Sequence, residues 1–389
     1  MRKSIIDFLK RHRVILDIFW KLASGLIWCL GLFVKKDKNM VIFASFGGRK
    51  FDDSPKAIYD EMCNRDEFRE WKFVWAFVEP NAYALPRGTA VRIDTFSFFL
   101  YLLKSKVWVS NSGMTRGIKI KRNKVVSVET WHGTPIKKIC GDEHTSGLYK
   151  RKEKVKIDSH TIRCSQSKYD KTLFARLFSA APECIYECDL PRNDKLLKYS
   201  EEDIKRIKCT VGINNDAKVV LYTPTYREYL KNETGINMDL NRWQECFGDK
   251  YVLLIRAHYA VSQSLDIKES MNIIDVSEYD TLNDLYVIAD MMISDYSSTF
   301  FDYSILGRPM FCYAYDIEEY SEKRGLYLKL DEVLPCRVDK NEDMLFDSII
   351  NCDYIDACMK TKQFADKFVP NVGNASKFIV DKIIEKCEL

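Results

Sequence analysis

The sequence lacks the short signatures of several common enzyme classes. It contains no D-x-D triplet, no G-x-x-x-x-G-K-[ST] loop and no G-x-G-x-x-G fingerprint. These absences disfavour a metal-dependent diphosphate site, an ATPase and an NAD-dependent enzyme, and the absence of a G-x-S-x-G elbow disfavours a serine hydrolase. None of the 13 cysteines forms a C-x-x-C pair, so no metal finger is predicted and a reducing compartment is the expected location.

A surplus of either charge is also missing. The 60 basic and 56 acidic residues alternate finely along the chain and leave a net charge of +4. A nucleic-acid-binding protein carries a concentrated basic surface, so nucleic acid is not an expected partner. The hydrophobic content of 46% is that of a well-packed globular protein, and 389 residues predict two domains with a smaller element at one end.

The longest apolar stretch covers residues 14–34 and follows a basic segment at residues 1–13. Its length is close to that of a membrane span, but Asp17 and Lys21 interrupt it. Apolar residues recur at helical spacing with cations between them, which favours amphipathic helices that lie on the inner leaflet. We therefore predict membrane-associating helices over residues 1–36, at the cytoplasmic face of the cell membrane. A single span and an ordinary core helix are the alternatives.

From residue 39 onward, short apolar runs alternate with amphipathic segments, which predicts an α/β fold with parallel sheets. The predicted strands of the first half cover residues 40–44, 72–78, 106–110, 125–129 and 161–165. Those of the second half cover residues 218–222, 251–256, 273–276, 291–294 and 310–313. Helices are predicted over residues 55–63, 168–177 and 281–289. The pattern indicates two doubly wound Rossmann-type domains, residues 37–200 and 201–365, that face each other across a cleft.

Polar clusters follow four of the predicted strands. They cover residues 129–135 (ETWHGTP), 223–227 (TPTYR), 256–258 (RAH) and 294–298 (SDYSS). Ligands of open parallel sheets bind at the carboxyl ends of the strands, so the clusters predict one cleft that both halves share.

Histidine is scarce, with five in the chain, and two of them lie in these clusters. His132 precedes Gly133, which permits a close approach, and Pro135, which stiffens the loop. An imidazole titrates near neutrality, so His132 suits a general base. His258 lies two residues after Arg256 on a predicted strand, so both face the same side and can neutralise phosphate charge. A purely structural role is the alternative for each histidine.

A second phosphate-binding feature is predicted where Ser297 and Ser298 precede an amphipathic helix. The start of a helix presents unpaired N–H groups and a positive dipole, which suit a phosphate. Asp302, one turn later, can reach a ribose or glycerol hydroxyl. Arg192 and Arg227 are candidates for a fork that holds phosphate. A plain helix cap and surface or ion-paired arginines are the alternatives.

Five sequence blocks, taken in order, resemble the CDP-glycerol glycerophosphotransferase family. They are residues 129–139 (ETWHGTPIKKI), 190–194 (LPRND), 222–227 (YTPTYR), 256–259 (RAHY) and 294–302 (SDYSSTFFD). The family builds wall teichoic acid and related capsular polymers at the inner membrane face and is similar in fold to GT-B glycosyltransferases. The resemblance implies a GT-B-like fold with an acceptor-side first domain, a donor-binding second domain and a C-terminal helix, within residues 366–389, that returns to the first domain. Asp189 stands where the family often has glycine, which we interpret as a local loop change.

The resemblance also implies an activity. It is the transfer of glycerol phosphate from CDP-glycerol to a lipid-linked saccharide or glycerol phosphate acceptor at the membrane, with release of CMP, by a primase or short-chain polymerase. No cofactor and no obligatory metal is expected. The catalytic residues would be His132 and His258. The residues that line the CDP-glycerol pocket would be Gly133, Thr134, Pro135, Ile136, Arg192, Arg227, Glu228, Arg256, Asp295, Ser297, Ser298 and Asp302.

Other functions stay open on the sequence alone. A CDP-ribitol donor is the first alternative, and a non-catalytic, membrane-associated nucleotide-binding scaffold is the alternative from another class. A glycosyltransferase that uses a sugar nucleotide is a further one. A homo-oligomer is left open.

Overall fold

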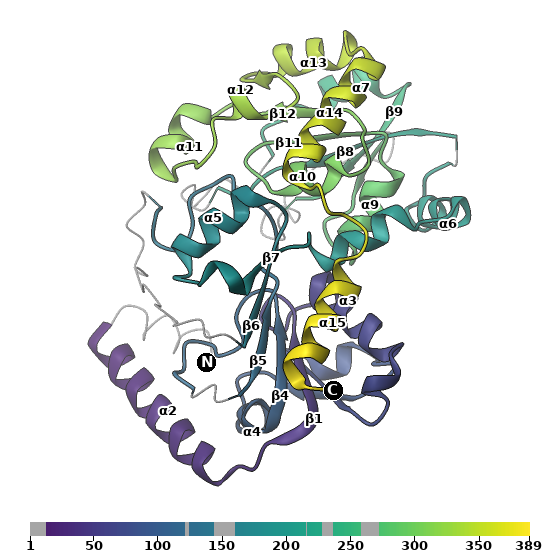
Figure 1. Cartoon of the computed structure of the whole chain (residues 1–389). Helices are drawn as coiled ribbons and strands as arrows, with labels where there is room; N and C mark the ends of the chain where they lie inside the picture. Colours follow the sequence, from purple (N-terminus) through teal and green to yellow (C-terminus); the bar gives the residue numbers. More distant parts are fainter. Residues whose placement is uncertain (1–12, 121–123, 144–159, 215, 228–235, 258–271) are drawn as a thin grey trace.

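The computed structural model describes residues 13–120, 124–143, 160–214, 216–227, 236–257 and 272–389. These residues form two α/β domains, each built on one parallel sheet, with the amino-terminal helix α2 (Arg13–Phe33) beside the first domain (Figure 1). The predicted fold class of two parallel sheets is therefore confirmed.

The first sheet has seven strands in the order β3-β2-β1-β4-β5-β6-β7, and all neighbours run parallel. The strands are β1 (Asp37–Ala44), β2 (Lys72–Phe77), β3 (Thr89–Arg92), β4 (Ser105–Ser110), β5 (Val126–Glu129), β6 (Thr161–Ser165) and β7 (Ile185–Glu187). The helices around it are α3 (Asp53–Cys63), α4 (Phe96–Lys104) and α5 (Lys168–Leu177), with short 3-10 turns η1 (Asp66–Phe68), η2 (Pro80–Ala82), η3 (Pro182–Cys184) and η4 (Pro191–Leu197).

The second sheet has six parallel strands in the order β10-β9-β8-β11-β12-β13. They are β8 (Lys218–Thr223), β9 (Tyr251–Ile255), β10 (Ile273–Asp275), β11 (Met291–Ser294), β12 (Met310–Tyr313) and β13 (Val338–Asp339). Its helices are α6 (Glu201–Val211), α7 (Leu240–Phe247), α9 (Leu282–Ile288), α10 (Thr299–Ser304), α11 (Ile317–Lys323), α12 (Leu330–Val333), α13 (Glu342–Ile350) and α14 (Tyr354–Phe368).

Strand β1 shows why these apolar runs become central strands. Val41 and Phe43 pack into one core cluster, whereas Ile42 and Ala44 pack into another on the opposite face of the sheet. Successive side chains of a strand point to opposite faces, so a strand that is covered on both sides must be apolar at every position. All ten strands predicted from such runs are present, and the predicted helices match α3, α5 and α9.

The order of the strands fixes where a ligand can bind. In each sheet the order of the strands along the chain reverses at one point. This point lies between β1 and β4 in the first domain and between β8 and β11 in the second. A crevice opens at the carboxyl ends of the strands at such a point. The loops that follow these strands therefore face each other across the space between the domains.

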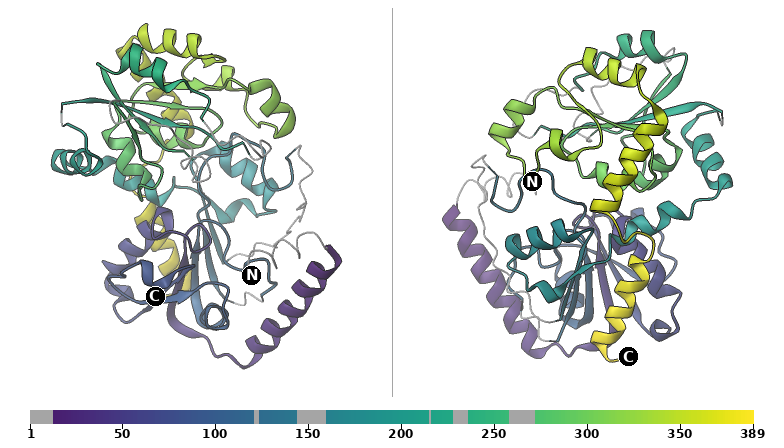
Figure 2. Two further views of the ribbon diagram at one scale, coloured as in Figure 1. Left: turned by 180° about the vertical axis from the view of Figure 1, so that it is seen from behind. Right: turned by 45° about the horizontal axis from the view of Figure 1, so that its top comes forward.

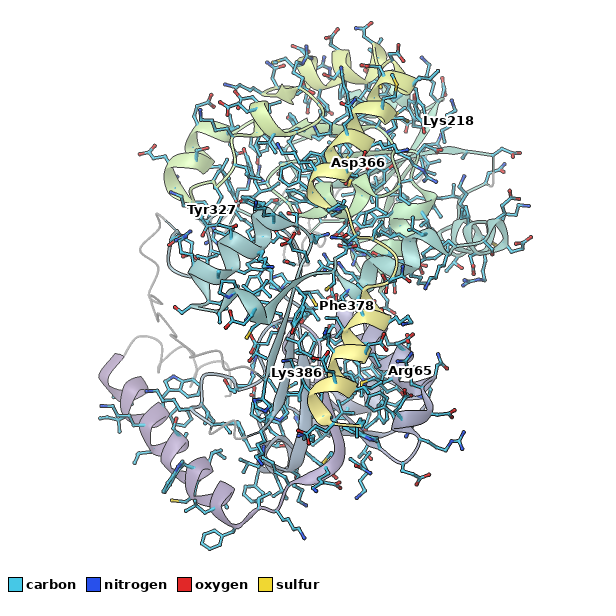
Figure 3. The ribbon with its side chains drawn as sticks, in the orientation of Figure 1. Arg65, Lys218, Tyr327, Asp366, Phe378 and Lys386 are labelled. Atoms are coloured by element: carbon cyan, nitrogen blue, oxygen red, sulfur yellow. The ribbon has the colours of Figure 1, made fainter. Side chains whose placement is uncertain are left out.

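The end of the chain joins the two domains. Helix α14 packs on the second domain, where Phe364 and Phe368 contact Phe301 of α10. Helix α15 (Ala375–Cys387) then lies along α3 of the first domain (Figure 3). The Asp194 carboxylate accepts hydrogen bonds from the first two backbone N–H groups of α15, at 2.9 and 2.7 Å, and so fixes its start.

Helix α2 lies beside the first domain, as the further views in Figure 2 show. Many of its apolar side chains are exposed. Ile27 is buried, whereas the side chains of Leu22, Leu26 and Leu32 are exposed. Within the described residues, no helix is both long and apolar enough to cross a membrane. Residues 1–12 of the predicted membrane-associating segment lie outside the described part of the chain, and membrane association stays a prediction.

Candidate active site

A cleft of about 1130 Å³ lies between the two domains. Its first-domain wall comes from the loops after β1 and β5 and from η4, and its second-domain wall comes from β9, α9 and α10. Of the residues predicted to form the site, the cleft brings together His132, Arg192, Arg256, Ser298 and Asp302. His258 and Glu228 lie outside the described residues.

The loop after β5 carries His132, and one of its two ring nitrogens already has a hydrogen-bond partner. Trp131 has a φ of 59°, and its ring stacks on the imidazole with 4.2 Å between centroids. The Nδ1 atom of His132 lies 2.9 Å from the carbonyl oxygen of Asn111. A carbonyl only accepts hydrogen bonds, so Nδ1 carries the proton and Nε2 keeps a lone pair. Burial lowers the pKa of His132 below its ordinary value of 6.5, which keeps the imidazole neutral near pH 7.

Gly133 brings this loop against the start of α10. Its φ is +139°, and a Cβ atom built at this position would lie 2.3 Å from Oγ of Ser298. Only glycine combines this backbone with so close a contact. The glycine therefore allows the histidine loop of the first domain to touch the serine loop of the second.

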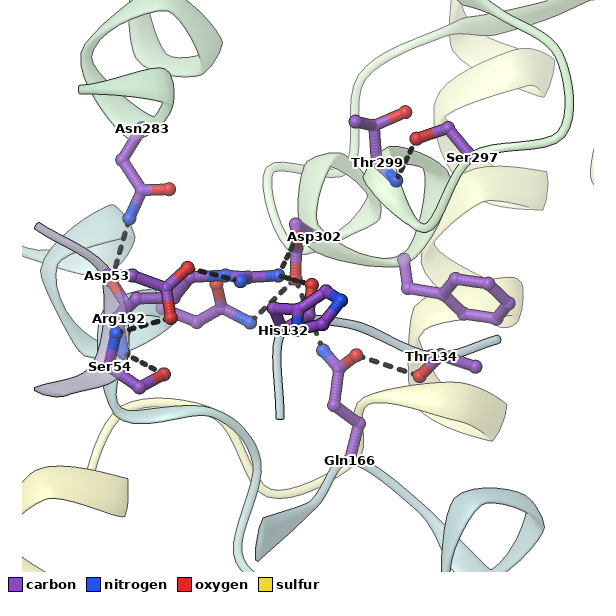
Figure 4. Close-up of polar contacts among 12 residues, drawn as sticks. Asp53, Ser54, His132, Thr134, Gln166, Arg192, Asn283, Ser297, Thr299 and Asp302 are labelled. Atoms are coloured by element: carbon purple, nitrogen blue, oxygen red, sulfur yellow. Dashed lines mark hydrogen bonds and ion pairs between the residues drawn. The ribbon is translucent and has the colours of Figure 1, made fainter. Parts of the chain in front are cut away.

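Arg192 is held between carboxylates of both domains (Figure 4). It lies in η4, and its guanidinium bonds Asp53 at the start of α3 and Asp302 in α10, each at 2.6 Å. It also donates to the backbone carbonyl of His132 at 3.2 Å. Burial alone would lower the pKa of Arg192, but Asp302 and Asp53 more than offset it and the pKa is raised. Both terminal nitrogens of the guanidinium are thus hydrogen-bonded to groups of the protein itself.

Behind Arg192 lies a buried polar network. Gln166 and Asn193 donate to Asp302 at 3.3 and 3.0 Å. Thr134 is fully buried, and its hydroxyl lies 2.8 Å from Gln166 (Figure 4). The same hydroxyl lies 2.8 Å from Asp170. Burial raises the pKa of Asp170 to about 7. The network holds Asp302 in place from the side away from the cleft.

The rest of the predicted loop passes into the second domain. Ile136 is buried in the core cluster of that domain, and its carbonyl accepts a hydrogen bond from the backbone of Tyr327 at 2.7 Å. The Pro135 carbonyl accepts one from the Tyr169 hydroxyl at 2.9 Å. Thr134, Pro135 and Ile136 therefore lie behind the cleft wall, where they connect the domains.

Arg227 and Asp295 form a second buried ion cluster away from the cleft. The guanidinium of Arg227 bonds Asp295 at 2.6 Å and Asp316 at 2.8 Å, and it lies over the ring of Tyr296. This cluster joins the loops after β8 and β11. Ser297 also lies outside the cleft lining, and its hydroxyl accepts from the backbone N–H of Thr299 at 3.3 Å.

Sequence reasoning missed Lys50 and Asp52, which line the cleft after β1. Lys50 donates to the carbonyl of Asp280 at 3.2 Å, and Arg256 donates to the carbonyl of Tyr279 at 2.6 Å. Burial lowers the pKa of both cations, and the charge of Arg256 lowers that of Lys50 further. Burial raises the pKa of Asp52 to about 6. Two desolvated cations from opposite domains therefore share one space, a setting that an anion would stabilise.

The sequence matches the family described as CDP-Glycerol:Poly(glycerophosphate) glycerophosphotransferase over residues 27–385. The chain belongs to this family. The predicted resemblance is thereby confirmed, and so is the class of enzyme, a glycerophosphotransferase.

Three members illustrate the range of similarity. The teichoic acid poly(glycerol phosphate) polymerase of Staphylococcus epidermidis is 33% identical over 88% of this chain, which spans half of that protein's length. The polymerase of Bacillus spizizenii is 29% identical over 97% of this chain and 98% of its own. The structure of the wall teichoic acid polymerase TagF superposes with a TM-score of 0.83 at 30% identity, over 99% of this chain and 98% of that one. Curated teichoic acid ribitol-phosphate polymerases are more distant, at 24–27% identity.

The position of Arg192 generates a prediction about stability in this family member. Arg192→Met leaves two buried carboxylates without their cation and should lower the free energy of unfolding by about 3–5 kcal/mol. The double variant Arg192→Met/Asp302→Asn has one buried charge fewer. Its loss of unfolding free energy should therefore be at least about 1 kcal/mol smaller than the summed losses of the single variants Arg192→Met and Asp302→Asn. Urea denaturation measures all three.

A matched control is Arg69→Met, because Arg69 bonds Asp66 at 2.6 Å on the open surface. That change should cost less than about 1 kcal/mol. Equal losses for Arg69→Met and Arg192→Met would contradict the role given to Arg192.

Proposed function

We propose that this chain transfers glycerol phosphate from CDP-glycerol to a lipid-linked acceptor and releases CMP, in teichoic acid or capsular polymer biosynthesis. One observation carries the proposal: a neutral His132 imidazole opens into an interdomain cleft that also holds two desolvated cations, Lys50 and Arg256. Family membership and the CDPG soak of TagF support the choice of donor. The greater distance of the ribitol-phosphate polymerases favours glycerol over ribitol.

The donor's diphosphate is proposed to lie between Lys50 and Arg256. Its negative charge would offset the mutual repulsion of the two cations and their loss of hydration. The Ser298 hydroxyl, in contact with the Gly133 loop, lines the same cleft and is placed to donate to a phosphate oxygen. Arg192 is instead proposed to position other residues of the site, because its terminal nitrogens already bond Asp53 and Asp302.

The proposed reaction is an in-line transfer at the phosphorus that bears the donor's glycerol. A hydroxyl oxygen of the acceptor attacks this phosphorus while Nε2 of His132 takes the hydroxyl proton. The bond from the phosphorus to the bridging oxygen of the diphosphate breaks, and its electron pair leaves with CMP. Positioning and electrostatics supply most of the acceleration in such transfers. With two cations beside the diphosphate, we propose that no metal is obligatory.

The acceptor side of the proposal concerns α2. Its open apolar face is suited to the interfacial zone of a membrane, which would hold the cleft near lipid-linked substrates at the cytoplasmic face. Primase and short-chain polymerase activities both fit this arrangement.

The base assignment is tested by His132→Ala. CMP release from labelled CDP-glycerol in the presence of a lipid-linked acceptor should fall by about 10²–10⁴-fold, because the attacking hydroxyl keeps its proton. The affinity for CDP-glycerol should change little. His160→Ala is the matched control, since His160 precedes β6 and does not line the cleft. Near-full turnover by His132→Ala would refute the assignment.

The pH dependence follows from the direction of the His132 shift. Below its pKa the imidazole is protonated and cannot accept the hydroxyl proton, so kcat/KM should fall on the acid side with an apparent pKa below 6.5. Asp52 also titrates in this range, with a pKa of about 6. If His132 causes the fall of kcat/KM at acid pH, the same fall should be seen in Asp52→Asn. Its disappearance in that variant would assign the fall to Asp52 instead.

The diphosphate site predicts a binding defect for Lys50→Met. Loss of a charged hydrogen bond of about 1.5–3 kcal/mol weakens CDP-glycerol binding by about tenfold or more. Calorimetric titration of the donor measures the change. Lys56→Met is the control, because Lys56 lines the cleft but already bonds Asp60 at 2.6 Å. Equal effects of the two changes would contradict a specific site at Lys50.

A further inference from the structure

Phe46, in the loop after β1, lies beside His132 in the wall of the cleft. The centroid of its ring lies 6.0 Å from that of the imidazole, with 54° between the two planes. Among the described residues that line the cleft, Phe46 is the only one with a ring contact to His132, and its side chain is half-buried. The neighbouring groups of the lining, Arg192, Ser298 and Asp302, are all polar. The base therefore has one apolar surface beside it in the cleft.

The backbone of Phe46 has a conformation that bulky residues rarely adopt. Its φ is 47°, and Gly47 and Gly48 follow with φ values of 65° and 83°. The left-handed region costs a residue with a side chain about 1–2 kcal/mol. Strained residues of this kind cluster at active sites and ligand clamps, where the strain sets the direction of a side chain. The direction of the Phe46 ring is therefore a candidate for a function of its own.

Two residues at the end of β4 hold the loop in this conformation. The backbone N–H of Phe46 donates to Oδ1 of Asn111 at 2.8 Å, and that of Gly47 donates to Oγ of Ser112 at 2.9 Å. Asn111 is buried, and its own carbonyl oxygen is the partner of Nδ1 of His132. One residue thus fixes both the phenyl ring and the imidazole, so the ring cannot leave the base without breaking a buried hydrogen bond.

The same loop leads from Phe46 to the proposed diphosphate site at Lys50, which pairs with Ser45 in an antiparallel bridge. Cytidine is attached to the phosphate that leaves as CMP, so it lies away from the reacting phosphorus. The donor's alditol is attached to that phosphorus and therefore lies near His132 and Phe46. The terminal unit of the acceptor must enter the same space for its hydroxyl to reach Nε2. The C–H groups of either polyol can pack against the face of the phenyl ring.

We propose that the Phe46 ring closes the space for the alditol beside His132 and so selects a three-carbon unit over a five-carbon one. The ring occupies volume that the two additional CHOH groups of ribitol would need. The alditol concerned is that of the donor or that at the end of the acceptor, which share the same chemistry. The inference rests on the proposed function, because it concerns the selectivity of the same site.

The test measures kcat/KM for CMP release by the full chain in two arms. The donor arm compares CDP-glycerol with CDP-ribitol on one lipid-linked acceptor. The acceptor arm uses CDP-glycerol with acceptors that end in glycerol phosphate or in ribitol phosphate. Phe46→Ala should raise the ribitol-to-glycerol ratio by about tenfold or more in one arm, since one methylene group alone changes discrimination by about 10–200-fold. The arm in which the ratio rises identifies the alditol that the ring contacts.

Two further variants separate selectivity from a general effect on the fold. Phe46→Leu keeps an apolar side chain of smaller size, so it should raise the ratio less than Phe46→Ala does. Phe51→Ala is the matched control from the same part of the chain. Phe51 also lines the cleft, but its ring packs against Trp75 with 4.8 Å between centroids. In Phe51→Ala the ratio should stay at the value of the wild type in both arms.

Two results would overturn the inference. An unchanged ratio in both arms for Phe46→Ala and Phe46→Leu would show that the ring does not limit the alditol. An equal rise in Phe46→Ala and Phe51→Ala would show a general loosening of the cleft instead. The proposed function would fail in a different way, through the absence of CMP release from CDP-glycerol by the wild type with either acceptor.

Discussion

The Arg192 guanidinium lies between two buried carboxylates, Asp53 from the first domain and Asp302 from the second. Without the arginine both carboxylates would be buried with no cation beside them, which costs several kcal/mol. The arginine thus sets the distance between the domains. The contact of Gly133 with Ser298 depends on that distance. Within the first domain, Arg192 also donates to the carbonyl of His132. The position of the proposed base therefore depends on an ion pair at the wall of the same cleft.

The arginines and lysines of the site divide into two groups by their partners. Arg192 and Arg227 each bond two carboxylates and serve to join loops or domains. Lys50 and Arg256 contact backbone carbonyls, and no ion pair with a carboxylate is formed by either within the described residues. A carbonyl offers only a partial charge, so these two cations have no direct ion-pair partner, and the carboxylates of Asp52, Asp280 and Glu278 act on them only through longer-range attraction.

The sequence predicted the central strands well because burial on both faces demands continuous apolar runs, as in β1 and β4. It did not predict β3, β7 or β13, which are short strands at or near sheet edges and carry polar residues such as Thr89, Glu187 and Asp339. Their pairing depends on neighbours that no local pattern reveals.

The residues of the site also differ in how far the sequence predicts them. His132 was predicted from its rarity and its place after a strand, which are local features. Asp53 and Lys50 were not, because a Lys-Phe-Asp-Asp segment before a helix resembles an ordinary helix start. The role of Arg227 as a phosphate ligand stays a prediction. Its pairing with Asp316, 89 positions later, could not be predicted because it is a property of the fold alone.

The proposed reaction is the transfer of glycerol phosphate from CDP-glycerol bound in the interdomain cleft. Nucleotide release from CDP-glycerol, CDP-ribitol and a UDP-sugar, each with the same lipid-linked acceptor, tests it most directly. Nucleotide release should be much faster with CDP-glycerol than with the other two donors, and it should depend on the acceptor. Release of UDP from the sugar nucleotide, or faster release of CMP from CDP-ribitol, would contradict it.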